Sequence, residues 1–203
     1  MTTEVLLVRH GVAARVGDAV ERTDPGLSEL GRAQVRALAD TVAAEGIHAV
    51  HSSPQRRALE TARIVANPLG LTVHQNAGLA EFDFGAGDYL FFEELRDAED
   101  PRYFACMSGD LSGWGTDAAT FRKRVHTTVG ELAAAHRGER ILLSTHGGAL
   151  NALFGAILDL QPFWFFAPHN GGISRLNVDP RGRMQVVSLN EAGHLRAAGV
   201  VGS

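Results

Sequence analysis

The chain has 203 residues, 45% of them hydrophobic and 21% charged, with a formal net charge of −4. These values predict one domain of ordinary size with a buried core. No run of lysine or arginine stands out, so nucleic acid and anionic membranes are poor candidate partners. The single cysteine, Cys106, excludes an intrachain disulfide. The N-terminus has neither a basic segment nor a long apolar run, so we expect no signal peptide and no membrane span, and a cytoplasmic location.

Apolar runs alternate with helical patterns in the first half of the chain. Val5–Val8 is a continuous apolar run typical of a buried strand, and Arg9-His10-Gly11 follows it directly. Ser28 is expected to cap a helix whose apolar residues recur at helical spacing: Val35, Leu38, Ala39 and Val42. Residues 47–51 predict a second strand, and Pro54 is expected in the first turn of the next helix.

The second half of the chain repeats this alternation. The expected elements, in chain order, are a helix marked by apolar positions over 121–132 and ending before Gly138, a strand over 141–143, a helix over 150–157, and two strands over 173–178 and 184–189 joined by a turn. Alternating strands and helices predict an α/β fold. We expect a three-layer sandwich with a mostly parallel central sheet and helices on both faces.

Residues 83–119 interrupt the alternation with acidic and aromatic side chains. We expect a partly helical cap segment inserted into a single domain spanning 1–203, because such excursions often cover a site. Its aromatic residues are expected to pack in a small core more than to bind substrate. Its acidic residues hint at a leaving group that is not a polyanion. The aromatic run 163–166 suits either the core or a dimer surface, so a homodimer is possible.

Three of the predicted strands are followed by residues that can catalyse a reaction or bind phosphate. The first is followed by Arg9 and His10, the second by Ser52–Arg57, and the third by His146. Ligands of open α/β sheets bind beyond the carboxyl ends of the strands, so these side chains should meet at one edge. Arginine offers paired donors that match phosphate oxygens and keeps its charge at physiological pH. A helix beginning near Pro54 would also favour an anion at its amino end. The pattern therefore predicts a phosphate site.

The ordered motifs resemble those of the histidine phosphatase superfamily, also called phosphoglycerate mutase-like. The matching segments are Leu7–Gly11, Leu27–Gly31 with Gln34, Ser52–Ala58 with Thr61-Ala62, Leu79–Glu81 with Gly85, and Ser144–Gly148. They follow the family's order and spacing over nearly the whole chain. A lone Arg-His-Gly tripeptide would be weak evidence of kinship, whereas the ordered set is strong.

The resemblance implies a role for each of five residues. His10 is the nucleophile that forms a phosphohistidine, and Arg9 and Arg57 bind the phosphate. His146 donates to the phosphate oxygens, and Glu81 is the general acid that protonates the leaving oxygen and then the base that activates water. The same division satisfies elementary chemistry, because an attacking imidazole needs one free ring nitrogen and a leaving alkoxide needs a proton.

Two neighbours compete with these assignments. Asp83 is a rival to Glu81 as the acid, but Glu81 matches the motif better. Arg56 is a rival to Arg57 as the phosphate-binding residue, but the following Ala58 fixes the register of the motif match at Arg57.

The other seven histidines are expected to be structural or surface residues, although His169 could lie beside the pocket. No histidine pair has a metal-ligand spacing, so we expect neither metal nor cofactor.

The sequence also departs from the family pattern. Val12, Ala13 and Val16 stand where the family often has polar residues, including an asparagine, so one phosphate contact is lost or supplied elsewhere. After Glu81, residues 86–88 replace an aromatic-acid-glycine element.

The leading hypothesis is a metal-independent phosphomonoesterase that acts on a small phosphate ester. The first alternative is a cofactor-dependent phosphoglycerate mutase, but the chain is short for one and lacks a long basic insert. The second alternative is an inactive protein that binds a phosphorylated ligand, suggested by Val12 and Val16.

Overall fold

The computed structural model describes residues 1–15, 23–87, 89 and 91–202, so Val16 and Asp88 lie outside the described residues. Its sheet has the strand order β3-β2-β4-β1-β5-β6. Four strands run parallel: β1 (Thr3–Arg9), β2 (Ala49–Ser52), β3 (Val73–Gln75) and β4 (Arg140–Thr145). The last two form an antiparallel hairpin at one edge: β5 (Ile173–Val178), which is antiparallel to β1, and β6 (Met184–Glu191).

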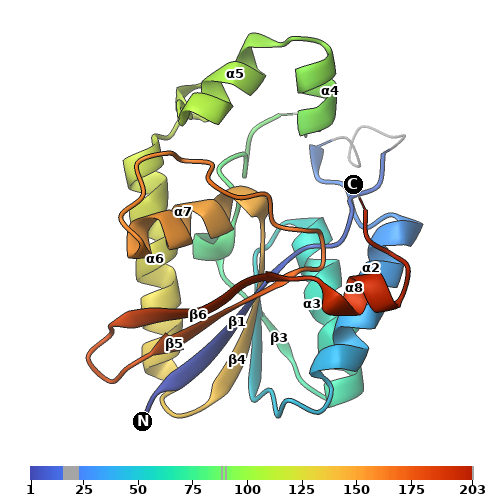
Figure 1. Ribbon diagram of the computed structural model, residues 1–203, viewed down its shortest axis with the longest axis vertical. Helices are drawn as coiled ribbons and strands as arrows, with labels where there is room; N and C mark the ends of the chain where they lie inside the picture. The colour runs from blue at the N-terminus through green and yellow to red at the C-terminus, as the bar shows by residue number, and fades with distance from the viewer. Residues whose placement is uncertain (16–22, 88, 90, 203) are drawn as a thin grey trace.

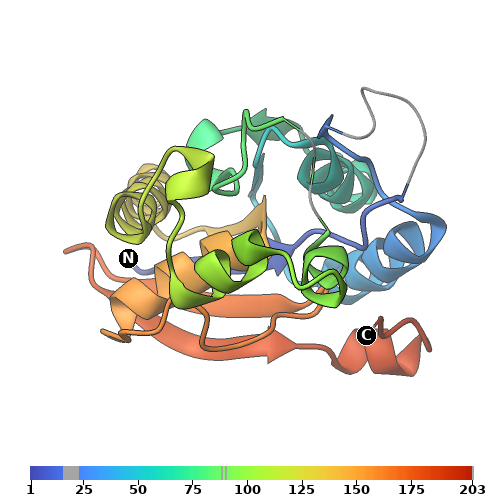
Figure 2. The ribbon, with the colours of Figure 1, turned by 90° about the horizontal axis from the view of Figure 1, so that it is seen from above.

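Helices cover both faces of this sheet (Figures 1 and 2). Side chains of a strand point alternately to opposite faces. Accordingly Val5 and Leu7 join one apolar core, whereas Leu6 and Val8 join the other. The first core includes residues of α6 (Ala118–Ala135) and α7 (Gly147–Ile157), and the second includes residues of α2 (Glu29–Val42) and α3 (Arg56–Leu69). The predicted α/β fold with three layers and a mostly parallel sheet is confirmed.

The predicted start of α2 is confirmed, whereas the predicted start of α3 is wrong. Ser28 caps α2 as expected, since its Oγ accepts the N–H of Gly31 at 3.0 Å. Helix α3 begins at Arg56, not at Pro54. The Ser53 Oγ accepts the N–H of Gln55 at 3.2 Å, which forms a turn before the helix. The carboxylate of Asp24 then accepts the first helical N–H, that of Arg56, at 3.0 Å.

The sequence pattern did not predict three short elements. They are β3, the 3-10 turn η1 (Ala77–Leu79) and α8 (Gly193–Ala197), which packs against α2. Each has five residues or fewer, which is too short for a period of two or 3.6 residues to emerge from the sequence. Strand β3 is also largely exposed and lies at the sheet edge, so its sequence shows no apolar run.

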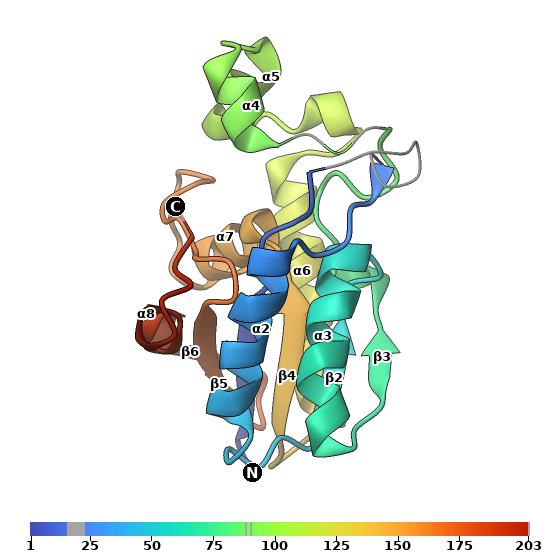
Figure 3. The same cartoon turned by 90° about the vertical axis from the view of Figure 1, so that its right-hand side faces the viewer.

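The cap segment, residues 83–119, contains α4 (Phe92–Asp97), α5 (Pro101–Ser108) and the 3-10 turn η2 (Ser112–Trp114). Helices α4 and α5 pack on each other and lie beyond the carboxyl ends of the parallel strands (Figures 1 and 3). Phe92 and Trp114 pack against the core that contains α6 and α7. Across the described ranges, no helix is long and apolar enough to cross a membrane.

Candidate active site

Four of the five predicted site residues line a cavity of about 440 Å³, whose lining comes from the carboxyl ends of the strands, the cap segment and the loop after α7. Arg9 ends β1 and His10 follows it, Arg57 lies in the first turn of α3 after β2, and Glu81 follows η1. His146, the fifth, is the N-cap of α7 after β4, and its ring centroid lies 5.0 Å from that of His10. The parallel strands therefore bring distant motifs together, as the sequence predicted.

His10 is held as a neutral imidazole with a defined tautomer. Its Nδ1 lies 2.8 Å from the Gly11 carbonyl, which can only accept, so Nδ1 carries the proton. The Nε2 lone pair then accepts from Nε of Arg57 at 3.2 Å. Burial, followed by the charges of Arg57 and Arg9, holds the pKa of His10 well below its usual range. An uncharged ring with a lone pair on Nε2 is the form that can act as a nucleophile.

The guanidinium groups of Arg57 and Arg9 offer donors to an anion. Arg57 is 1% exposed, its guanidinium lies 4.3 Å from the centre of the Tyr89 ring, and the carboxylates of Asp24 and Asp83 are 3.7 and 3.6 Å away. Arg9 donates from Nη1 to the Pro168 carbonyl at 2.6 Å. Among the described groups, the Arg57 Nη1 and the Arg9 Nε are buried without a hydrogen-bond partner. Buried donors of this kind are rare, and two on one cavity favour an anionic ligand.

His146 is fully buried and neutral. Its Nε2 lies 2.8 Å from Oγ of Ser53, whereas its Nδ1 has no partner among the described groups. Burial, followed by the charge of Arg57, holds the pKa of His146 well below its usual range. The ring can therefore donate one N–H without bringing a positive charge into the site.

Glu81 is a buried carboxyl group with a strongly raised pKa. It is 7% exposed, and burial followed by the negative charge of Asp83 raises the pKa of Glu81 to about 7. The N–H of Gly148, at the amino end of α7, opposes this rise by donating to its Oε2 at 2.7 Å. A carboxyl group with a pKa near 7 can both release and accept a proton at neutral pH.

The structure distinguishes Arg56 from Arg57, but it places Asp83 in the same cavity as Glu81. The Arg56 side chain is 42% exposed and lies 3.7 Å from the carboxylate of Glu60, outside the residues that line the cavity. Asp83 does line the cavity, together with Glu81. Its carboxylate accepts from Nε2 of Gln55 at 2.9 Å, so it is fixed beside Arg57.

Further residues hold the site, and the sequence did not assign them a role. Gln55 bridges the two acidic positions, because its Oε1 also accepts the N–H of Glu81 at 2.8 Å. Arg124 of α6 donates to the Ala80 carbonyl at 2.6 Å, and Asn170 donates to the His10 carbonyl at 2.8 Å. Gln55 could have been found from the sequence, because it lies within one of the matching motifs. The sequence pattern of α6 gives no signal that Arg124 contacts the site.

The segment around His169 lies beside the cavity, whereas the His169 side chain is not among its lining groups. The lining residues include Ala167 and Pro168, and the N–H of Gly171 donates to the Arg9 carbonyl at 2.9 Å. Val12 stands where the resembling family often has a polar residue. Its backbone N–H donates to Gln34 Oε1 at 3.0 Å. The apolar side chain of Val12 lines a smaller cavity of about 240 Å³ that also reaches His10.

Aromatic residues of the cap segment divide between two environments. Tyr89, Phe92 and Tyr103 line the large cavity, and Phe92 also packs against the core, so the expectation that these aromatics serve mainly to pack stays a prediction. Trp114 does pack against the core. In the run 163–166, Phe163 is buried and the next three side chains line the cavity.

In the described part of the chain, no group of three or more His, Cys, Asp or Glu side chains could hold a metal ion. Independence from metals and cofactors stays a prediction.

Comparison with known proteins identifies the family. Residues 5–192 match the histidine phosphatase superfamily (branch 1). Phosphoserine phosphatase 1 of Hydrogenobacter thermophilus is 28% identical over 95% of this chain and 94% of its own. The metal-independent phosphoserine phosphatase of Arabidopsis thaliana is 31% identical over 75% of this chain and 67% of its own.

A solved structure agrees with these sequences. The phosphoserine phosphatase of Entamoeba histolytica, a histidine-to-alanine mutant in complex with phosphoserine, is 25% identical to this chain. It has a TM-score of 0.77 and covers 95% of this chain and 99% of its own. The family match covers nearly the whole chain, and the relatives named for phosphatases confirm the predicted enzyme class. The chain belongs to the histidine phosphatase superfamily and is a phosphohydrolase of that family.

Proposed function

We propose that this protein is a phosphomonoesterase that hydrolyses a small phosphorylated metabolite through a phosphohistidine on His10, without a metal ion. One observation carries the proposal. A neutral imidazole with its Nε2 lone pair beside two arginines lines the same cavity as a carboxyl group with a pKa of about 7. The nucleophile, the phosphate-binding cations and the proton donor of a two-step hydrolysis are all present.

In the first step, Nε2 of His10 attacks phosphorus in line with the ester oxygen. A P–N bond forms as the P–O bond breaks, and protonated Glu81 gives its proton to the leaving alkoxide. Arg9 and Arg57 supply donors to the phosphoryl oxygens, whose charge is stabilised during transfer. His146 supplies another donor from Nδ1 in the tautomer whose Nε2 accepts from the Ser53 hydroxyl.

In the second step, ionised Glu81 takes a proton from water while the water oxygen attacks phosphorus. The P–N bond breaks, its electron pair returns to Nε2 of His10, and inorganic phosphate leaves. Glu81 is again protonated, so the cycle closes without a net change in the protein. A pKa near 7 suits both the acid and the base role of Glu81, since its protonated and ionised forms are both well populated at neutral pH.

The cap segment covers the site in this proposal and contacts the part of the substrate beyond the phosphate. Its residues Tyr89, Phe92 and Tyr103 line the same cavity as the charged residues. Relatives named phosphoserine phosphatase favour hydrolysis over a mutase reaction and a small phosphate ester as substrate. The cytoplasmic location and the homodimer stay predictions from sequence.

The test is phosphate release from p-nitrophenyl phosphate and O-phosphoserine, with and without EDTA. We expect His10→Ala to lose roughly 10³-fold or more in turnover. His126→Ala is the matched control, because His126 lies on α6 outside the cavity lining. Wild-type turnover no faster than that of His10→Ala would contradict the proposal. Prompt formation of 2-phosphoglycerate from 3-phosphoglycerate only with 2,3-bisphosphoglycerate would support the mutase instead.

A further inference from the structure

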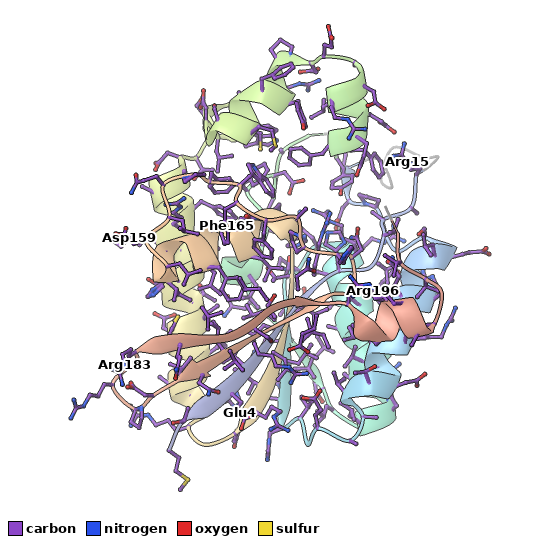
Figure 4. All side chains as sticks on the ribbon, in the orientation of Figure 1. Glu4, Arg15, Asp159, Phe165, Arg183 and Arg196 are labelled. Atoms are coloured by element: carbon purple, nitrogen blue, oxygen red, sulfur yellow. The ribbon has the colours of Figure 1, made fainter. Side chains whose placement is uncertain are left out.

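The large cavity has two chemically different parts. Its charged part contains Arg9, His10, Arg57, Glu81 and Asp83. Its remaining wall is mostly apolar, and Phe165, labelled in Figure 4, lies between α7 and the cap helices. The residues of this aromatic wall are Phe92, Tyr103, Met107, Trp164, Phe165 and Phe166. A volume of about 440 Å³ falls in the range of cavities, roughly 300–1,000 Å³, that enclose whole small organic molecules.

Three polar groups of the aromatic wall already have partners within the protein. The indole N–H of Trp164 donates to the Cys106 carbonyl of α5 at 3.0 Å. Oδ1 of Asn151, a buried residue of α7, accepts the N–H groups of Phe165 and Phe166 at 3.0 and 3.3 Å. These bonds fix the loop, and they leave no free backbone donor from Phe165 or Phe166 for a ligand.

The charged residues of α4 that reach the cavity have partners elsewhere. Glu93 lies 3.8 Å from Arg15, and Arg96 lies 2.9 Å from Asp97. The side chains of Glu93 and Arg96 are 56% and 59% exposed, which places them at the solvent-facing mouth. A leaving group with an ammonium and a carboxylate would need buried polar partners deeper in the cavity. The carboxylates there, Glu81 and Asp83, already accept from Gly148 and Gln55.

From these observations we propose that the cavity selects a phosphomonoester of an apolar alcohol, one with an aryl or extended alkyl group, over phosphoserine and phosphoglycerate. The phosphate binds at the charged part, and the organic group lies against the aromatic wall. Apolar surface left half-exposed around a cavity gains free energy when a ligand removes it from water. This inference rests on the proposed function for the phosphate site and adds the substrate class.

Two series of compounds test the inference separately from catalysis. The first contains non-hydrolysable phosphonates, whose binding is measured by calorimetry: ethylphosphonate, 3-phenylpropylphosphonate and 2-amino-4-phosphonobutanoate, which mimics phosphoserine. We expect 3-phenylpropylphosphonate to bind at least about tenfold more tightly than either of the others, since each buried methylene contributes about fourfold. Equal binding, or tightest binding of the amino acid analogue, would overturn the inference even if the enzyme hydrolyses phosphate esters.

The second series contains ethyl phosphate, 3-phenylpropyl phosphate and O-phosphoserine, all esters of primary alcohols. We expect kcat/KM to be highest for 3-phenylpropyl phosphate by a similar factor. If the phosphonates show the expected preference but no ester is turned over, the proposed hydrolysis fails while the specificity of the cavity stands.

Matched variants assign the preference to the aromatic wall. Phe165→Ser should reduce the preference for the phenylpropyl compound over the ethyl compound by about tenfold. Phe104→Ser, on α5, should leave the ratio unchanged, because Phe104 is 56% exposed and lines no part of this cavity. Met107→Ser is a second wall variant, at a position that is 43% exposed. An undiminished ratio in both wall variants would overturn the inference.

Discussion

Replacing Glu81 by glutamine should stabilise the protein in alkaline solution while it impairs catalysis. The carboxyl group is buried, and its pKa of about 7 compares with a usual value of 4.5. Between these two values the folded state holds a proton that the unfolded state has released. The stability of the wild type therefore falls as pH rises through this window, and the contribution of neutral Glu81 is complete below pH 4.5 and lost above pH 7.

The size of the effect follows from the difference between the two pKa values. That difference, 7 minus 4.5, is about 2.5, and each pH unit corresponds to about 1.36 kcal/mol. Ionised Glu81 therefore costs about 3 kcal/mol of folding free energy at pH 8 and nothing at pH 4. Glutamine keeps an oxygen acceptor for the Gly148 N–H, which donates at 2.7 Å in the wild type, and has no charge to desolvate.

Urea unfolding of the wild type and Glu81→Gln at several values between pH 4 and pH 8 measures this difference. The free energy of unfolding of the variant, relative to the wild type, should rise by about 3 kcal/mol across the series. Most of the rise should occur between pH 4.5 and pH 7. A difference that stays constant with pH would refute the claim that Glu81 is forced toward its neutral form.

Three further predictions test the site. Glu81→Gln should slow hydrolysis of an alkyl phosphate on the order of 10²–10⁴-fold but that of p-nitrophenyl phosphate far less, because nitrophenolate leaves without a proton; equal losses would argue against proton donation. Asp83→Asn removes a negative charge that raises the Glu81 pKa, so the alkaline decline of alkyl phosphate hydrolysis should move to lower pH, and an unchanged pH–rate profile would contradict this. Gly148→Ala would place a Cβ 2.4 Å from Oε1 of Glu81 and should cost about 1–3 kcal/mol of stability with a loss of activity. Gly130→Ala on α6, where the nearest atom lies at 3.5 Å, is its control, and equal effects of the two would exclude a specific clash.

The fold was predictable from sequence where the apolar patterns are long. The sequence of β1 is a continuous apolar run because both of its faces are buried. The start of α2 was predictable because Ser28 is a favoured N-cap residue. β3 and α8 were not predicted, because so few residues cannot show a hydrophobic periodicity. The start of α3 was misplaced because a local cue, Pro54, was overridden by a distant acceptor, Asp24.

The candidate site was predictable where it follows strand ends. Arg9, His10 and His146 could be brought together from topology, since parallel strands place their carboxyl ends at one edge. The contacts of Arg124 and Asn170 with the backbone around the site depend on three-dimensional packing that no local pattern encodes. The aromatic wall could not be predicted for the same reason, because its two halves come from the cap segment and the loop after α7.

The most direct test of the central claim is detection of the phosphoryl group on His10. Glu81→Gln with p-nitrophenyl phosphate should accumulate the intermediate, because the first step then needs no acid and the second lacks its base. Intact mass after quenching without acid should show a gain of one phosphoryl group. The gain should be absent when His10→Ala is added and retained when His126→Ala is added. Phosphate release without any adduct, or an adduct that persists without His10, would contradict the account.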